Sequence, residues 1–185
     1  NGCWTNHHSI VNYKDQWYLF YHHNAYSPKD DKRRSVQIEK LYFNADGTIQ
    51  EVTPTLRGVG PVMAGSEVQT DRYSSIDGAY IEYVDTSDLF KGWKTVFAKA
   101  GDSVRFDDLD FGKKAPKKVT ICYKAASDAV VEVKAGDVCT AVALPASDVW
   151  TEAVVKVKGK IKGLQDLSVT LAEGTDVEVD WLTFK

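Results

Sequence analysis

Nearly every patterned segment of this chain alternates apolar and polar residues with a period of two. Successive side chains of a strand point to opposite faces of a sheet, so this alternation is typical of strands. Turn residues separate the segments at short intervals, for example at Asp15, Gly47, Gly101 and Gly136. No segment combines an apolar helical stripe with caps at both ends. The sequence therefore predicts an all-β protein.

Composition narrows the class of protein further. The chain has 185 residues, of which 43% are hydrophobic, and its 21 aromatic residues exclude intrinsic disorder. No apolar run approaches the roughly 20 residues that a membrane-spanning helix needs. The formal net charge is −3 and no basic stripe is present, which argues against nucleic acid as the main partner. Because the first residue is Asn1 rather than Met, we expect a processed product or a piece of a longer polypeptide.

The two parts of the chain differ in composition. All four histidines and nine of the 21 aromatic residues lie within residues 1–60. The run Gly58-Val59-Gly60-Pro61 has the composition of a linker or a sharp turn. We therefore expect two domains, 1–60 and 61–185.

The first part predicts a four-stranded antiparallel sheet. Its candidate strands are Ser9–Lys14, Gln16–His23, Arg34–Phe43 and Thr48–Val52. The second of these strands is apolar on both faces, with Trp17, Leu19 and Tyr21 on one face and Tyr18 and Phe20 on the other. Such a sheet needs apolar neighbours on both sides. This pattern fits one blade of a β-propeller whose remaining blades lie outside the chain.

The second part predicts a β-sandwich, or jelly roll, because its short alternating strands are separated by regular turns. The candidate strands are Tyr80–Val84, Trp93–Ala98, Asp102–Phe106, Lys118–Ala125, Val130–Lys134, Thr140–Leu144, Thr151–Lys158, Asp166–Ala172 and Asp176–Phe184.

Three cysteines, Cys3, Cys122 and Cys139, are too few and too scattered for a disulfide framework or a zinc site. Cys122 and Cys139 can pair only if their strands are neighbours. Otherwise we expect small buried apolar side chains.

The first part resembles the last blade of glycoside hydrolase family 43, the five-bladed propeller of arabinofuranosidases and β-xylosidases. The resemblance rests on Thr5-Asn6-His7-His8-Ser9-Ile10-Val11, Trp17-Tyr18-Leu19-Phe20-Tyr21-His22, Arg33-Arg34-Ser35-Val36 and Leu41-Tyr42-Phe43-Asn44-Ala45-Asp46-Gly47-Thr48-Ile49. It implies an inverting glycosidase, which needs a general acid and a general base on opposite faces of the sugar. In that family the catalytic carboxylates lie in earlier blades. We therefore expect no catalytic residue in this chain, and no activity from it alone.

The same resemblance implies two supporting residues in the parent active site. His7 matches a histidine on the central channel, and Arg34 matches an arginine that reaches the substrate pocket. Both side chains can donate hydrogen bonds to sugar hydroxyls or to a carboxylate. The alternative for His7 is an ordinary strand residue. His22 and His23 are neighbours on one strand and point to opposite faces, so they cannot chelate one metal ion.

The second part resembles carbohydrate-binding module family 6. The resemblance rests on Val68-Gln69-Thr70-Asp71-Arg72-Tyr73-Ser74-Ser75-Ile76-Asp77-Gly78, Gly101-Asp102-Ser103-Val104-Arg105-Phe106, Leu109-Asp110-Phe111-Gly112, Val149-Trp150-Thr151 and Val179-Asp180-Trp181-Leu182-Thr183-Phe184. It implies a cleft that holds a sugar ring between two aromatic side chains. Trp150 matches one of them, and Phe97 or Trp93 matches the other. Glu178 stands where the family has a hydrogen-bonding Asn. The alternative is that Trp150 and Phe97 are core residues and the sugar site is lost.

A structural Ca²⁺ is a further implication of this resemblance. Gln69, Asp71 and Asp180 match its ligand positions, and Ca²⁺ prefers carboxylate, amide and carbonyl oxygens. The alternative is a pair of solvated surface acids.

Together these resemblances imply the C-terminal portion of a modular hemicellulose-degrading glycosidase, extracellular or periplasmic, that binds polysaccharide such as xylan or arabinoxylan. Its partners would be this polysaccharide and the remaining blades of the propeller. The alternatives are a stand-alone sugar-binding or docking module without catalysis, and a purely structural spacer.

Overall fold

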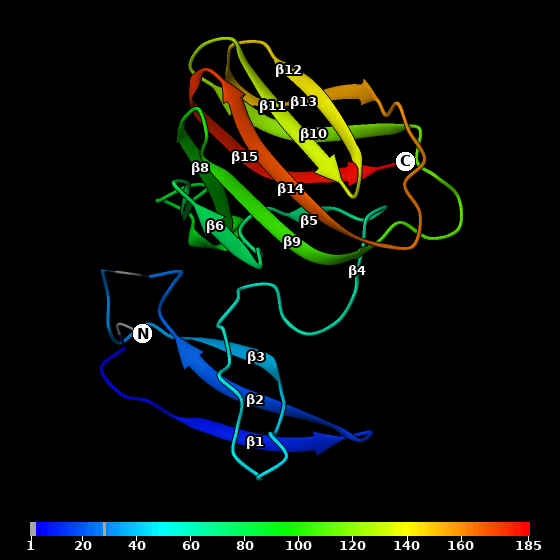
Figure 1. Ribbon diagram of the computed structural model, residues 1–185. Coiled ribbons are helices and arrows are strands. Elements are labelled where there is room, and N and C mark those ends of the chain that lie inside the picture. Colours follow the sequence, from blue (N-terminus) through cyan, green and yellow to red (C-terminus); the bar gives the residue numbers. More distant parts are fainter. Residues whose placement is uncertain (1–2, 28) are drawn as a thin grey trace. The chain divides into compact units, whose positions relative to one another are not determined.

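The computed structural model describes residues 3–27 and 29–185 and consists of strands, turns and one short 3-10 helix, η1 (Leu89–Lys91) (Figure 1). The prediction of an all-β protein is confirmed. The chain divides into two compact units, Asn1–Gly60 and Pro61–Lys185, and the division falls where the composition of the sequence changes. No helix in the described part of the chain is long and apolar enough to cross a membrane.

The first unit is built on a three-stranded antiparallel sheet with β2 in the middle. Its strands are β1 (His8–Tyr13), β2 (Gln16–His23) and β3 (Ser35–Leu41). Lys14 and Asp15 both have positive φ angles, of 49° and 62°, as the tight turn of a two-residue hairpin requires. Ile10 lies opposite Leu19, and Leu19 lies opposite Glu39, so these three residues share one face of the sheet.

The fourth strand expected at Thr48–Val52 is reduced to a single bridge between Phe43 and Ile49. Beyond that bridge the chain continues without strand pairing. It is fastened to the sheet by a side chain instead: Glu39 Oε1 accepts hydrogen bonds from the Thr55 amide (2.7 Å) and the Thr55 hydroxyl (2.8 Å). The buried Glu39 carboxylate therefore attaches this segment to the sheet, where the backbone hydrogen bonds of a fourth strand were expected.

The first unit has almost no apolar core of its own. Among its described residues, Leu41 is the one buried hydrophobic side chain, whereas Ile10, Val11, Trp17 and Val36 are all exposed. The register places apolar side chains on both faces of the sheet, as the sequence predicts. Each face thus lacks the covering layer that a stable sheet needs.

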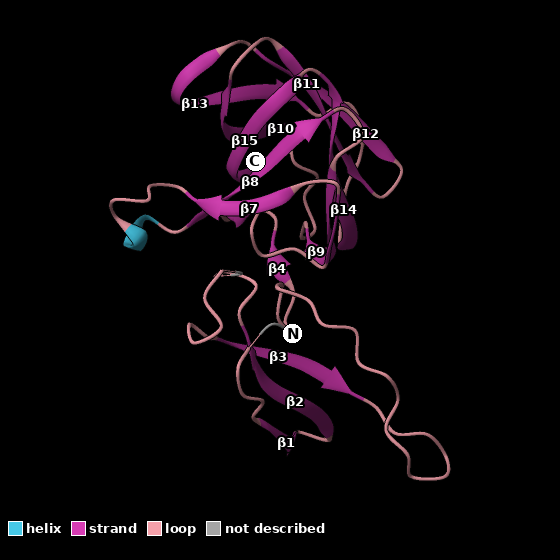
Figure 2. Ribbon diagram, turned by 90° about the vertical axis from the view of Figure 1, so that its left-hand side faces the viewer, coloured by secondary structure: helices cyan, strands magenta, loops and turns pink. Residues whose placement is uncertain are grey.

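The second unit is a sandwich of two six-stranded sheets (Figures 1 and 2). One sheet has the order β13 (Ser147–Lys156), β10 (Lys118–Ala125), β15 (Thr175–Phe184), β8 (Trp93–Lys99) and β7 (Tyr80–Tyr83), with β5 (Val68–Gln69) also paired to β15. The other has the order β12 (Val138–Leu144), β11 (Ala129–Ala135), β14 (Leu164–Glu173), β9 (Ser103–Asp110) and β4 (Val62–Met63), with β6 (Ser75–Asp77) also paired to β9. The prediction of a β-sandwich is confirmed.

The sandwich core follows from the alternation along each strand. In β10, Val119, Ile121 and Tyr123 are buried in the core cluster, and in β11 Val131 and Val133 belong to the same cluster. Because the cluster draws on strands of both sheets, the two inner faces pack against each other. The residues between these core positions therefore point away from the core, toward the outer faces.

The Gly101-Asp102 motif has a structural role between the two sheets. Asp102 is buried, and its Oδ2 accepts hydrogen bonds from the amides of Ala98 (2.8 Å) and Lys99 (3.0 Å), which fixes the turn from β8 to β9. Gly78 has φ +71°, and a Cβ atom there would lie 2.2 Å from Asp102 Oδ1. Only glycine fits this close approach.

Cys3, Cys122 and Cys139 all lie in the described part of the chain, and none of them forms a disulfide. Cys122 on β10 and Cys139 on β12 belong to different sheets, so their strands are not neighbours. Cys122 is half-buried, whereas Cys139 is exposed, so the expectation of a buried side chain is wrong for Cys139.

Candidate functional site

A pocket of about 660 Å³ lies on the outer face of the β13-β10-β15-β8-β7 sheet, at the end where β7 and β8 are connected. It is lined by Glu82, Tyr83, Val84, Asp85, Thr86, Lys91, Lys94, Lys124 and Trp150. Trp150 is the tryptophan that the sequence assigns to a sugar clamp. It is partly exposed and is not a member of the core cluster, so its ring is accessible from the pocket.

Register explains why Trp150 points outward. Tyr123 pairs with Thr151 and belongs to the core cluster, so the neighbouring positions Lys124 and Trp150 face the other way. Lys124 Nζ lies 5.1 Å from the centroid of the indole ring, within the range of a cation–π contact. This contact supports the orientation of the indole at the entrance of β13.

A buried ion pair forms another part of the pocket wall. Lys94, which is 9% exposed, points from β8, and its Nζ lies 2.5 Å from Glu178 Oε1 on β15. Glu82 on β7 approaches the same ammonium at 4.0 Å. Glu178 therefore lies next to Lys94 of the pocket wall, and its carboxylate accepts a hydrogen bond from the Lys94 ammonium. An ammonium group carries three donors, so Lys94 adds donors to this edge of the pocket.

The sequence prediction for Phe97 is wrong. Phe97 is 0% exposed and belongs to the core cluster, because its partner Val177 is itself a core residue on β15. No sugar can reach its ring. Trp93 is partly exposed, and its ring lies 5.4 Å from that of Tyr83, at an angle of 31°. Of these two rings, it is Tyr83 that lines the pocket.

Tyr83 was not found from the sequence. It ends a short strand whose neighbours Tyr80 and Ile81 are equally apolar, so the pattern does not distinguish its role from that of a core residue. The cross-strand pairing of Tyr83 with Trp93 is the signal that could have drawn attention to Tyr83, because pairs of aromatic side chains commonly stabilise neighbouring strands.

The three residues expected to bind Ca²⁺ lie on two paired strands or next to them. Gln69 on β5 lies opposite Trp181 of β15, and the Thr70 amide donates to the Asp180 carbonyl (2.9 Å). Burial, together with the negative charges of Asp71 and Glu67, raises the pKa of Asp180 to about 6. Asp71 is itself buried. The sequence analysis did not include Glu67 in this acidic group.

Closely spaced buried carboxylates repel one another, and a cation between them relieves that repulsion. Two carboxylates and an amide oxygen are suitable ligands for Ca²⁺. In the part of the chain that the structure describes, no group of three or more His, Cys, Asp or Glu side chains is arranged to hold a metal ion. Gln69, Asp71 and Asp180 thus offer the types of oxygen ligand that Ca²⁺ prefers, two carboxylates and one amide.

His7 and Arg34 lie at the same end of the sheet in the first unit. His7 directly precedes β1 and Arg34 directly precedes β3, and both are exposed. The His7 ring lies 6.0 Å from that of His22, whose Nε2 is 2.6 Å from the Thr5 carbonyl. The antiparallel order therefore places His7, His22 and Arg34 at one end of the sheet.

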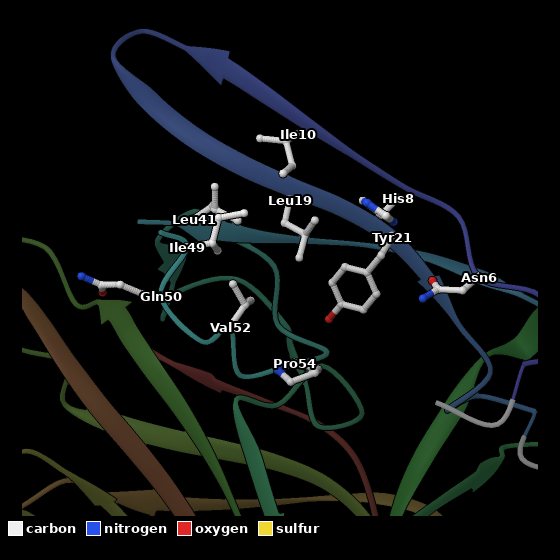
Figure 3. Close-up of a pocket in the computed structure, with 10 residues that line it drawn as sticks. All are labelled: Asn6, His8, Ile10, Leu19, Tyr21, Leu41, Ile49, Gln50, Val52 and Pro54. Atoms are coloured by element: carbon white, nitrogen blue, oxygen red, sulfur yellow. The ribbon is translucent and has the colours of Figure 1, made fainter. Parts of the chain in front are cut away.

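A second pocket, of about 440 Å³, lies on the sheet of the first unit (Figure 3). It is lined by Asn6, His8, Ile10, Leu19, Tyr21, Leu41, Ile49, Gln50, Val52 and Pro54. Leu19 and Tyr21 point from β2 toward the segment that carries Val52 and Pro54 (Figure 3). Most of this lining is aliphatic, so the pocket has the character of an incompletely covered apolar face rather than of a catalytic centre.

Comparison with known proteins supports the two resemblances separately. No family model matches the chain. A stretch of 49 residues is 45% identical to a β-xylosidase from Xylanibacter ruminicola, and it represents 26% of this chain and 15% of the relative. A xylosidase/arabinosidase from Humicola insolens is 39% identical over 51 residues, which represent 28% of this chain and 16% of the relative. The chain thus matches less than a fifth of the length of either relative.

Solved structures share the fold. A family 43 arabinoxylan arabinofuranohydrolase from Bacillus subtilis, in complex with cellotetraose, superposes with a TM-score of 0.66 at 22% identity, over 97% of this chain and 40% of its own. The CBM6 module from Clostridium stercorarium, in complex with cellobiose, superposes with a TM-score of 0.58 at 19% identity, over 68% of this chain and 97% of its own. Only the second unit is large enough to fill that 68%.

A third structure, a CBM36 module in complex with calcium and xylotriose, superposes with a TM-score of 0.50 at 19% identity, over 65% of this chain and 99% of its own. The recognition made from sequence is confirmed: the chain resembles family 43 glycosidases over a short stretch of sequence, and its fold is shared with part of a family 43 enzyme and with CBM6 modules.

Proposed function

We propose that this chain is the C-terminal portion of a modular hemicellulose-degrading glycosidase of the arabinofuranosidase or β-xylosidase type. Residues 61–185 bind a plant cell-wall polysaccharide such as xylan or arabinoxylan. Residues 1–60 form the last blade of the catalytic propeller. The observation that carries the proposal is the pocket on the outer face of the sandwich, where an accessible indole, Trp150, lies beside the paired charges of Lys94 and Glu178.

The chemistry of this pocket suits a sugar. The C–H face of a pyranose ring is apolar and packs on an aromatic ring, whereas its hydroxyl edge needs hydrogen bonds. Trp150 supplies the aromatic face. Lys94 can donate and Glu178 can accept, so the pair can satisfy a hydroxyl in either sense. Tyr83 also lines the pocket, and its ring lies beside that of Trp93.

The first unit contributes support rather than catalysis in this proposal. Its sheet is apolar on both faces and buries only Leu41 among its described hydrophobic side chains, so the remaining blades of the propeller are its natural partner. His7 and Arg34, at one end of the sheet, would then face the substrate of the complete enzyme. The acid and base carboxylates would come from other blades, and this chain alone is inactive.

Gln69, Asp71 and Asp180 would hold a structural Ca²⁺, which would offset the burial and the negative charges that together raise the pKa of Asp180. The ion would stabilise the pairing of β5 with β15 and would take no part in sugar binding. An extracellular or periplasmic location follows from the resemblance to polysaccharide-degrading enzymes.

Binding to insoluble and soluble polysaccharide tests the proposal. The intact chain should be retarded by xylan or arabinoxylan in affinity electrophoresis and should release heat with xylo-oligosaccharides in calorimetry. If no β-glycan binds, the sandwich is a spacer. The length of the encoded polypeptide separates the remaining alternatives: a stand-alone binding module would have no preceding propeller, whereas the proposed enzyme has one.

A further inference from the structure

The loop between β7 and β8 carries an aromatic side chain that is exposed to solvent and lies outside the core of its own unit. Phe90 lies within η1 and is fully exposed, and its neighbour Leu89 is also exposed. Figure 2 shows η1 at the tip of a loop that extends beyond the ends of β7 and β8. The other residues from Asp85 to Lys91 are polar or charged. A single exposed apolar residue is common in proteins, so its importance depends on how it is held and what lies beside it.

Hydrogen bonds hold this loop in one shape. Asp85 accepts bonds from the Ser87 amide (2.8 Å), the Ser87 hydroxyl (2.6 Å) and Lys91 Nζ (2.8 Å). Asp88 Oδ1 accepts from the Phe90 amide (3.2 Å), and the Val84 amide donates to the Gly92 carbonyl (3.0 Å) at the base of the loop. Phe90 is therefore presented to solvent by a braced loop rather than by a loose one.

The stem of the same loop is one wall of the Trp150 pocket. Val84, Asp85, Thr86 and Lys91 all line that pocket, and Phe90 lies between Thr86 and Lys91 in the chain. A polysaccharide that filled the pocket and left it across this wall would reach the loop that carries Phe90. A ring that is already held in position loses little conformational entropy when a ligand contacts it.

We propose that Phe90 is a second sugar-contacting ring, which packs against the part of a polysaccharide chain that extends beyond the Trp150 pocket. This inference rests on the proposed function and deepens it. It specifies that the ligand is an extended stretch of polysaccharide rather than a single sugar or a short chain end. The pocket binds one portion of the glycan through Trp150 and the Lys94–Glu178 pair. Phe90 adds affinity only for ligands long enough to reach it.

Calorimetry with xylo-oligosaccharides of increasing length tests this inference on the intact chain. Phe90→Ala should leave the affinity for the shortest ligand that binds unchanged and should weaken the longest by about two- to tenfold, the range for one aromatic contact. Phe90→Trp should retain the affinity for long ligands. Leu164→Ala, which truncates an exposed aliphatic side chain on the other sheet, should change neither. The melting temperature of Phe90→Ala should equal that of the parent chain, because the ring buries nothing.

Three results would overturn the inference. If Phe90→Ala weakens all lengths equally, or none, Phe90 is not an additional contact, while the pocket itself still stands. If the variant instead changes the oligomeric state in sedimentation at constant glycan affinity, the exposed ring contacts protein. If the parent chain binds no glycan of any length, the proposed function and this inference fail together.

Discussion

Lys94 Nζ lies 2.5 Å from Glu178 Oε1, so Glu178, which the sequence analysis assigned to the edge of a sugar cleft, is one half of an ion pair. Little of the Lys94 side chain is accessible, and Glu178 is about a quarter exposed, so neither charge can be removed without leaving the other poorly solvated. The pair is therefore both part of the pocket wall and a link between β8 and β15.

We expect Glu178→Gln to lower the free energy of unfolding by about 1–2 kcal/mol, less than for a fully buried pair because part of Glu178 remains in water. Urea denaturation measures this change. The double variant Lys94→Met, Glu178→Leu should regain much of the stability, since no charge is left unpaired, but should still bind xylo-oligosaccharides weakly. Full glycan affinity in the double variant would show that the pair does not contact the ligand.

Trp150→Ala should weaken glycan binding roughly tenfold, because one sugar–indole contact is lost and 1.4 kcal/mol corresponds to a factor of ten. Calorimetry gives the affinity, and Trp150→Phe should restore part of it. The melting temperature should change little, since the indole lies outside the core cluster. A loss of several kcal/mol in stability without any effect on binding would identify Trp150 as a structural residue.

Chelation should lower the melting temperature of the chain if Gln69, Asp71 and Asp180 hold Ca²⁺, because a ligand bound only by the folded state stabilises it. Asp180→Asn should remove the difference between calcium and chelator. Asp137→Asn, on the turn between β11 and β12, is the control and should keep that difference. Identical melting curves of the parent chain in calcium and chelator would leave Asp71 and Asp180 as buried acids without a metal.

Acid should loosen the first unit through His23. Burial lowers the pKa of His23 below the usual 6.5, so between those two values the unfolded chain takes up a proton more readily than the folded one. The stability that His23 contributes is thus present above pH 6.5 and is lost as the pH falls through the lowered pKa. Amide exchange of β2, corrected for the intrinsic rate, should therefore accelerate at acidic pH. His23→Gln should flatten this dependence, whereas His8→Gln, on an exposed residue of β1, should preserve it.

The isolated chain should not hydrolyse aryl arabinofuranosides or aryl xylosides, because the proposed acid and base carboxylates lie on other blades. Proton transfer by such groups contributes about 10²–10⁴ in rate. A chromogenic assay of the pure chain should give the rate of the buffer alone. Turnover that His7→Ala or Arg34→Ala abolishes would mean that this chain carries a catalytic site of its own.

The sequence predicted the fold well because alternation decides which residues of a strand are buried. Val131, Glu132 and Val133 of β11 follow that rule, as do Val119 and Ile121 of β10. It failed for Thr48–Val52, where Thr48, Ile49 and Val52 favour a strand but the partner strand ends at Leu41. Whether a β-prone segment pairs depends on the length of its neighbour, and composition does not show that length.

The candidate site was harder to predict. Trp150 and Phe97 were both assigned to a cleft through the resemblance to carbohydrate-binding module family 6, and the assignment fails for Phe97. Trp93, Lys94, Thr95, Val96 and Phe97 give no clear alternation, so only the pairing of Phe97 with Val177 decides that the ring points into the core. The partner of Glu178 lies 84 residues earlier in the chain, on another strand, and such a long-range ion pair cannot be recognised in one sequence.

The three-stranded sheet has a further consequence for the behaviour of the chain in solution. Within its described residues, β1 and β3 pair only with β2, and β1 is exposed along its whole length. A free strand edge beside exposed Ile10 and Val11 is a template on which a second chain can add a strand. This edge is therefore a starting point for aggregation, and any partner that pairs with β1 or covers Ile10 and Val11 would also protect the chain from self-association.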